Sequence, residues 1–391
     1  MFSKNDPVYI EGCHEYEEGL LKEKLKNALA ALGYEERIRG KRVVIKPNLV
    51  RRMDPSRGGT THPTMLSALI FLLYDLGAMS VLIAESPGGV YTPRALASVY
   101  EGCGIDKAAK KAGAELNFDC ASSGLSAPNG KKSKSFQVID PILKADLIIN
   151  LCKLKSHGML MLSCAAKNLF GVIPGVLKFE MHARFPAEED FAGMLADLDE
   201  ALYREKEILC VCDGIVGMEG NGPTGGDPVS LGVLLVSANP FNLDLAAGEI
   251  IGMKELPPLT AEAVGRGYCP EQFGQLVLLG REPEQHRASS FRMPDSRRSS
   301  TLKKVLTVHN GRYARFFEPK PRIDKKSCRG CGVCAKSCPQ GTILLYTDKK
   351  GRKKARILDK RCIKCYCCQE LCPFECVSIK KNLLIDLINR F

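Results

Sequence analysis

The sequence predicts an α/β fold, with a mainly parallel sheet covered by helices on both faces and a small α+β domain at the C-terminus. The first observation is that short aliphatic runs alternate with helical patterns over the first 280 residues, which is typical of wound parallel sheets. The second is that 10 of the 18 cysteines follow residue 319. We therefore expect two domains, residues 1–318 and 319–391, with residues 280–318 forming in part a linker.

The expected strands are short and apolar, as buried parallel strands usually are. A helix is predicted over residues 63–76, because Pro63 suits its first turn and Gly77 its end. Another begins after Thr92, and residues 377–391 show apolar side chains at helical spacing. The predicted strands are residues 42–45, 81–84, 147–151, 208–211, 233–236 and 276–279.

Polar and ionisable residues follow these strands. Because the carboxyl ends of parallel strands meet at one edge of a sheet, their convergence predicts a ligand site there. No P-loop and no G-x-G-x-x-G motif follows a strand, so no nucleotide site is indicated. The residues concerned are Lys46 and Asn48, then Glu85 and Ser86, then Lys153, Lys155 and His157, then Asp213 and Glu219, then Asn239 and Asp244.

Several of these positions have a plainer structural interpretation. Lys46 precedes a proline and could be a solvated loop charge, and His62 could simply cap the helix that starts at Pro63. Lys167 lies in an otherwise apolar helical segment, where a lysine is costly unless it reaches water or an anion. The candidate catalytic residues are Lys46, His62, Lys155, His157, Lys167 and Glu219.

The cysteine-rich tail carries the most specific motif. The spacing C-x2-C-x2-C-x3-C, followed by proline, occurs twice. This is the run of bacterial two-cluster ferredoxins, in which the fourth cysteine of each run ligates the other cluster. Zinc is the alternative metal, but paired C-x2-C units are its usual form. The spacing therefore predicts two [4Fe–4S] clusters, one held by Cys328, Cys331, Cys334 and Cys372 and the other by Cys362, Cys365, Cys368 and Cys338.

The net charge of +12 belongs to this tail. Residues 320–391 hold 18 Lys and Arg against 6 Asp and Glu, whereas residues 1–319 hold 38 of each kind. Basic side chains offset anionic clusters, and Lys349, Lys350 and Arg352 with their neighbours could dock an acidic redox partner. No nucleic-acid recognition motif accompanies the charge, so nucleic acid is not an expected partner.

The remaining cysteines form no ligand run. Cys210 and Cys212 alternate along a predicted strand and are expected to be buried. Cys152 and Cys164 flank Lys155 and His157, which leaves two interpretations open, packing in the core or a redox or ligand thiol.

The sequence also predicts a location. The first nine residues show no secretory signal, and the longest apolar stretch, residues 65–84, is broken by Asp75 and Gly77. We therefore expect a cytoplasmic protein with no membrane span.

Five short motifs follow one another along the first domain. They are Val44-Ile45-Lys46-Pro47-Asn48, Thr61-His62-Pro63, Lys153-Leu154-Lys155-Ser156-His157, Lys167-Asn168-Leu169-Phe170-Gly171 and Met218-Glu219-Gly220-Asn221-Gly222-Pro223. In this order they resemble the domain-of-unknown-function family 362, whose members often carry a ferredoxin module of this kind. Where the family usually has Lys-Thr-His, this chain has Lys155-Ser156-His157, which keeps a small hydroxyl. The resemblance implies a layout but no settled reaction.

Three functions compete. The first is an iron–sulfur-dependent oxidoreductase, in which lysines hold a small anionic or carbonyl-bearing substrate, His157 or His62 delivers a proton and Glu219 or Glu85 orients the ligand. The second is an electron carrier whose N-terminal domain docks to a larger redox complex. The third is a maturation factor that handles a metal through His62, His157 and nearby carboxylates. We favour the oxidoreductase, because a polar crevice exceeds what docking requires.

Overall fold

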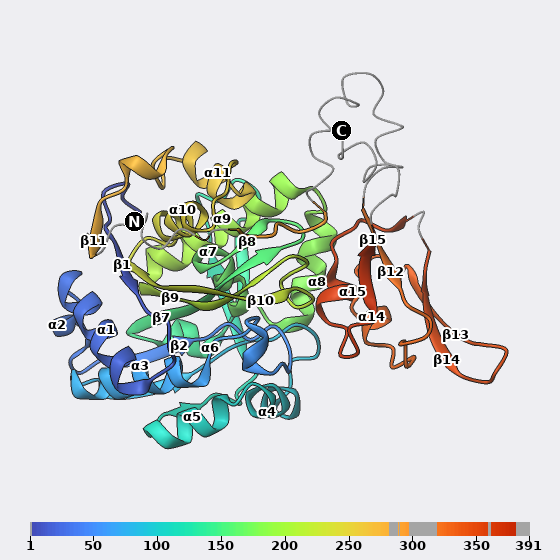
Figure 1. The fold of residues 1–391 in the computed structure, drawn as a ribbon, viewed down its shortest axis with the longest axis horizontal. Helices are drawn as coiled ribbons and strands as arrows, with labels where there is room; N and C mark the ends of the chain where they lie inside the picture. The colour runs from blue at the N-terminus through green and yellow to red at the C-terminus, as the bar shows by residue number, and fades with distance from the viewer. Residues whose placement is uncertain (1, 281–287, 289, 297–318, 359–360, 381–391) are drawn as a thin grey trace.

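A computed structural model describes residues 2–280, 288, 290–296, 319–358 and 361–380. Figure 1 shows a large α/β body and a smaller module, built from the C-terminal residues, that lies against it near α8 (Gly175–Arg184). Within the described part of the chain, no helix is long and apolar enough to cross a membrane.

The large body is built on a nine-stranded sheet with the order β11-β1-β10-β9-β7-β2-β3-β4, in which β8 pairs with β7. The pairs β7–β9, β2–β7, β2–β3, β3–β4 and β1–β11 are parallel, which confirms the predicted α/β class. The strands are β1 Val8–Gly12, β2 Arg42–Lys46, β3 Ser80–Ile83, β4 Glu115–Leu116, β7 Leu147–His157, β8 Met161–Ser163, β9 Glu207–Glu219, β10 Asp227–Ser237 and β11 Leu278–Gly280.

One strand reverses the expected direction. β10 runs antiparallel to both of its neighbours, β9 and β1. Its last residue, Ser237, therefore pairs with Cys210 near the start of β9. Asn239, which the sequence placed at the site edge, lies at the opposite edge, where its amide donates to the carbonyls of Ser3 and Tyr268.

Helices cover both faces of the sheet because strand residues alternate between two hydrophobic cores. Leu147 and Ile149 of β7 belong to the first core, and Ile148 and Cys152 to the second. The first core is covered by α1 (Glu18–Ala31), α3 (Pro63–Asp75), α4 (Pro93–Gly102) and α5 (Ile105–Ala112), and the second by α6 (Asp140–Lys144), α7 (Ala165–Asn168), α9 (Glu188–Glu205), α10 (Pro240–Ile250) and α11 (Pro258–Gly265). The helix α2 (Glu35–Ile38), the hairpin β5 (Ser122–Ser126) and β6 (Ser135–Ile139), and the 3-10 turns Pro55–Arg57, Leu169–Val172 and Phe273–Gln275 complete the body.

The C-terminal module consists of two small antiparallel sheets and two short helices. Val377–Lys380 forms strand β15 against β12 (Lys320–Ile323), so the helix predicted over residues 377–391 is wrong at its start. Val377 and Ile379 are both buried, which is the period of a strand. The rest of that predicted helix lies outside the described residues. The other elements are α14 (Val333–Lys336), β13 (Ile343–Thr347), β14 (Lys353–Ile357) and α15 (Cys367–Glu370).

Candidate functional site

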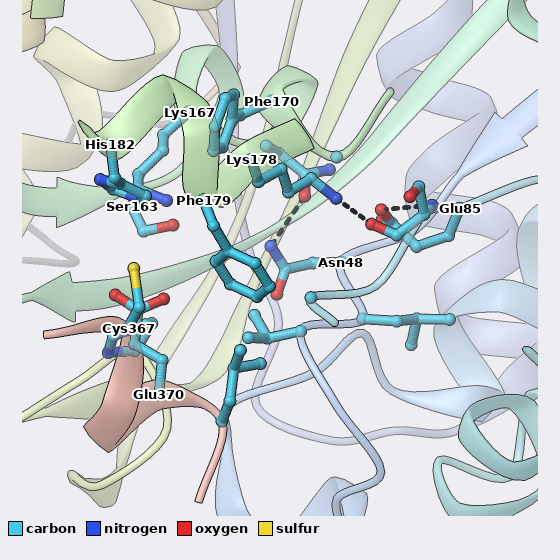
Figure 2. A pocket seen from close by; sticks show the side chains of 18 of the residues that line it. Asn48, Glu85, Ser163, Lys167, Phe170, Lys178, Phe179, His182, Cys367 and Glu370 are labelled. Carbon is cyan, nitrogen blue, oxygen red and sulfur yellow. Dashed lines mark hydrogen bonds between the residues drawn. The ribbon is translucent and has the colours of Figure 1, made fainter. Parts of the chain in front are cut away.

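A cavity lies where the carboxyl ends of β2 and β3 meet α7, α8 and the C-terminal module. It encloses about 650 Å³, including the solvent at its mouth. Figure 2 shows that side chains of the large body line one side, while Cys367 and Glu370 of α15 approach from below, facing Ser163 and His182. The polar lining comprises Lys46, Asn48, Glu85, Ser86, Ser163, Lys167, Asn168, Lys178, His182 and Glu370.

Lys46 and Glu85 form a buried ion pair in the cavity wall. The Lys46 ammonium donates to the Glu85 carboxylate at 2.5 Å and to the Pro47 carbonyl at 2.9 Å. Both side chains are shielded from solvent, and burial lowers the pKa of Lys46 while Glu85 opposes this. Gly171 packs directly against this ion pair. Glycine has no Cβ, and a Cβ added at this position would lie only 2.3 Å from Glu85 Oε1. The positive charge of Lys46 is thus already balanced.

Two amides connect the cavity to the interior. The Asn48 amide donates to Asn168 Oδ1 at 2.7 Å, and Asn168 donates in turn to Asn150 Oδ1 at 2.8 Å. Behind them, the Lys155 ammonium donates to Asn48 Oδ1 at 2.6 Å and to the Gly59 carbonyl at 2.7 Å. Burial lowers the pKa of Lys155 to about 7. Lys155 therefore supports a cavity residue without itself lining the cavity.

Two further lysines bring charge that no carboxylate balances by direct contact. Lys178 is buried and donates to the Ser86 carbonyl. Burial lowers its pKa to about 7 and also lowers the pKa of Lys167. Within the described residues, Lys167 lies 5.8 Å from the ring of Phe170, and the charges of Glu370 and Glu85 act on Lys167 and Lys178 only from a distance. An anion bound between Lys167 and Lys178 would add negative charge in direct contact with both ammonium groups.

His182 completes this side of the cavity. It lies one helical turn after Lys178, is 5% exposed and stacks on Phe191 at 4.2 Å. Its Nδ1 atom has no hydrogen-bond partner in the described structure, and burial lowers its pKa to about 3. Sequence analysis missed Lys178 and His182, although two residues that are four apart in a helix lie on the same face of it.

His157 lies behind Glu370. Its Nδ1 accepts from the backbone N–H groups of Met159 and Leu160, each at 3.1 Å, so the proton of the neutral ring is on Nε2. That atom faces Glu370 Oε1 at 3.4 Å. Burial lowers the pKa of His157 to about 4, whereas for Glu370 the effect of burial is outweighed by His157 and Lys167, which lower its pKa to about 2.

The sheet separates the remaining candidates from the cavity. On its opposite face, Lys153 donates to Asp213 at 2.7 Å and to the Tyr16 hydroxyl at 2.8 Å. His62 caps α3 through Nδ1 and stacks on Tyr16 at 3.6 Å, which is the plainer of its two predicted roles. Burial lowers the pKa of His62 to about 4. The structure therefore brings Lys46 and Lys167 together and keeps His62 apart from them.

Glu219 also lies outside the cavity lining. Its carboxylate pairs with Arg292 at 2.7 Å. The loop that follows it contacts the C-terminal module, since Gln369 donates to the Asn221 carbonyl at 2.8 Å and Thr224 donates to the Glu370 carbonyl at 3.0 Å. This glycine-rich segment therefore positions the module.

The module offers two smaller cavities, and each is lined by one of the predicted cysteine sets. Cys338, Cys362, Cys365 and Cys368 line the first, and Cys328, Cys331, Cys334 and Cys372 the second. Each set takes its fourth thiol from the other run, as [4Fe–4S] ligation in ferredoxins requires. Cys367 and Cys376 are extra thiols beside these sets. The donor sets thus fit iron–sulfur clusters.

Comparison with known families agrees with this geometry. Residues 43–249 match the family described as Domain of unknown function (DUF362). The chain belongs to this family. The match contains the cavity residues of β2, α7 and α8. Residues 327–376 match a 4Fe-4S dicluster domain, which supports an iron–sulfur electron-transfer role for this DUF362 protein.

Two curated relatives extend the match. A thylakoid-associated protein of Synechocystis sp. is 30% identical over 296 residues, which are 74% of this chain and 88% of the relative. An uncharacterized ferredoxin of Methanocaldococcus jannaschii is 33% identical over 58 residues, 15% of this chain and 74% of the relative. Among solved structures, the lactate racemase apoprotein from Thermoanaerobacterium thermosaccharolyticum aligns with a TM-score of 0.35 and 14% identity, covering 63% of this chain and 57% of that one.

Proposed function

We propose that the chain is an iron–sulfur reductase that passes electrons from its C-terminal module to a small anionic or carbonyl-bearing molecule in the cavity. One observation carries this proposal. The helix α15 supplies Cys367 and Glu370 to the cavity wall, and Cys368, which directly follows Cys367, belongs to a cysteine set that fits a cluster. A molecule in the cavity would thus lie beside the electron-carrying part of the protein.

The side chains of the cavity suit an anion with an apolar part. Lys167 and Lys178 would bind the negative group, and Phe170 and Phe179 would pack against the rest and exclude water. Two bound [4Fe–4S] clusters would supply electrons one at a time, two in all. Lys178, with its pKa near 7, would hold a proton at Nζ for a carbonyl oxygen that gains electrons.

The test is re-oxidation of the reduced protein by candidate substrates. Protein reduced anaerobically with dithionite and freed of excess reductant is mixed with a panel of 2-oxo acids and unsaturated carboxylates. We expect one or more members of the panel to re-oxidise the clusters and so restore their absorbance. The double variant Lys167→Met with Lys178→Met should re-oxidise at least tenfold more slowly. Lys254→Met is the matched control, because Lys254 is exposed and lies in the segment between α10 and α11. A panel that re-oxidises wild type and double variant equally would contradict the proposal.

The hairpin of β13 and β14 favours a second candidate function, an electron carrier that docks to an acidic partner. Figure 1 shows this hairpin extending from the module on the side away from the large body. Leu344 and Leu345 are 40% and 48% exposed, and Lys349, Lys350 and Arg352 lie at or near its turn. If the chain is an electron carrier, Lys349→Glu combined with Lys350→Glu should abolish electron transfer to its partner, whereas Lys178→Met should leave that transfer unchanged.

A further inference from the structure

Three cysteines outside the cavity and outside the ferredoxin runs meet in the core of the large body. Cys152 of β7 and Cys212 of β9 are register partners on adjacent parallel strands. Cys164, at the start of α7, approaches both, with its sulfur 3.3 Å from that of Cys212 and 3.8 Å from that of Cys152. All three are fully buried, and their sulfurs lie within 4.8 Å of one another. We call them the thiol triad.

The sulfur–sulfur distances of the thiol triad are close to those around a single metal ion. A thiolate–zinc bond of about 2.3 Å in tetrahedral geometry separates two sulfurs by roughly 3.8 Å. An iron–sulfur cubane would hold its cysteines further apart, because each binds a different corner. Within the described residues, this is the sole group of three or more His, Cys, Asp or Glu side chains whose ligand atoms converge in this way.

Nearby polar groups have partners of their own. The two carboxylate oxygens of Asp244 accept from the N–H groups of Ala165 and Ala166, at 2.6 and 3.3 Å, and the same carboxylate also interacts with the Cys164 thiol. Cys210, two residues before Cys212, contacts the Asn150 amide and the Tyr203 hydroxyl instead. The three thiols therefore form one converging set of ligand atoms, with the Asp244 carboxylate beside Cys164. Soft thiolate donors select thiophilic ions such as Cu(I) and Zn²⁺.

We propose that the thiol triad binds one thiophilic metal ion and thereby anchors α7 to the sheet. The ion would replace the thiol protons of Cys152, Cys164 and Cys212, joining two strands to the residue that precedes α7. Because α7 spans four residues and presents Lys167 and Asn168 to the cavity, a metal at its start would fix both side chains. This site is independent of the reductase proposal.

The test is a metal count on the full chain, purified anaerobically from cells grown with added zinc or added copper. Wild type should carry about one equivalent of zinc or copper beyond its iron, and X-ray absorption at the edge of that metal should show sulfur neighbours at about 2.3 Å. Cys164→Ser and Cys212→Ser should each lose that equivalent while the iron content is unchanged. Cys210→Ser, a buried cysteine on the same strand, is the matched control and should retain it.

Retained iron and an unchanged circular dichroism spectrum would show that each variant is folded. Cys152→Ala is a further triad variant, and it should also lose the equivalent of zinc or copper. Zinc retention and copper retention both support the proposal and identify the ion. The proposal is overturned if wild type holds iron alone under both growth conditions. It is also overturned if the extra metal persists in all triad variants, or if mass spectrometry finds two of the three cysteines joined in a disulfide.

Discussion

Nε2 of His157 on β7 lies 3.4 Å from the Glu370 carboxylate on α15, so the large body and the C-terminal module meet through a buried polar pair at the cavity. Two family motifs take part in this junction, because His157 closes the Lys-Ser-His sequence and Asn221 of the glycine-rich loop contacts Gln369. On the other side, Arg51 pairs with Glu375 at 2.8 Å. These contacts hold the module against the cavity in one orientation.

His157→Ala should loosen this junction. The substitution leaves the N–H groups of Met159 and Leu160 and the Glu370 carboxylate without their partner, which should cost roughly 2–3 kcal/mol of unfolding free energy. Turnover should be lost, because Glu370 of the cavity lining would lose the side chain that positions it, while the iron content and the cluster spectra remain as in wild type. The measurements are anaerobic chemical denaturation and substrate-dependent re-oxidation. His14→Ala, at an exposed position, is the control, and unchanged turnover would show that the pairing of His157 with Glu370 does not support the reaction.

Anion binding should weaken as the pH rises through 7. Lys178 has its pKa lowered to about 7 by burial, so its ammonium is present below that pH and lost above it. Titration with sulfate, whose charge is constant over this range, should show an affinity on the order of tenfold higher at pH 6 than at pH 8.5. Lys178→Met should reduce the affinity at pH 6 and flatten the pH profile. A profile that is equally steep in the variant would assign the titration to another group.

The sequence predicted the edge of the sheet where the cavity lies, because apolar runs mark parallel strands and Lys46, Glu85 and Lys167 follow them or lie close by. It did not predict that β10 runs antiparallel, since strand direction depends on pairing rather than on composition. It also could not show that Lys153 lies on the opposite face of the sheet, or that Lys155 lies behind Asn48 instead of lining the cavity. The sequence also could not show that Glu370 lines the cavity, because no local pattern specifies how the C-terminal module docks on the large body.

Lys155 should make stability depend on pH in the alkaline range. Burial lowers its pKa from an ordinary value of 10.5 to about 7. Between these values the unfolded chain binds more protons than the folded one, so stability rises with pH, by up to about 1.4 kcal/mol per unit. Lys155→Met should remove this contribution. Denaturation midpoints of wild type and variant at pH 7.5 and 9.5 measure it, and a constant difference between the two proteins would contradict the assignment.

Gly171 offers the sharpest test of the cavity itself. A Cβ at this position would lie 2.3 Å from Glu85 Oε1 and 2.4 Å from Lys46 Nζ, so Gly171→Ala must push the two charges apart. Separating a buried ion pair leaves its charges poorly compensated and should cost about 3 kcal/mol of unfolding free energy. Binding of sulfate and re-oxidation by substrate should fall together.

Gly265→Ala is the matched control for Gly171→Ala, because Gly265 ends α11 and a Cβ there would meet no atom within 4 Å. We expect this substitution to leave stability within about 0.5 kcal/mol of wild type, as surface changes usually do. Denaturation of both variants, combined with their iron content, separates damage to the cavity from damage to the module. If Gly171→Ala bound sulfate as wild type does, the pairing of Lys46 with Glu85 would not be needed to keep the cavity open for the anion that Lys167 and Lys178 bind.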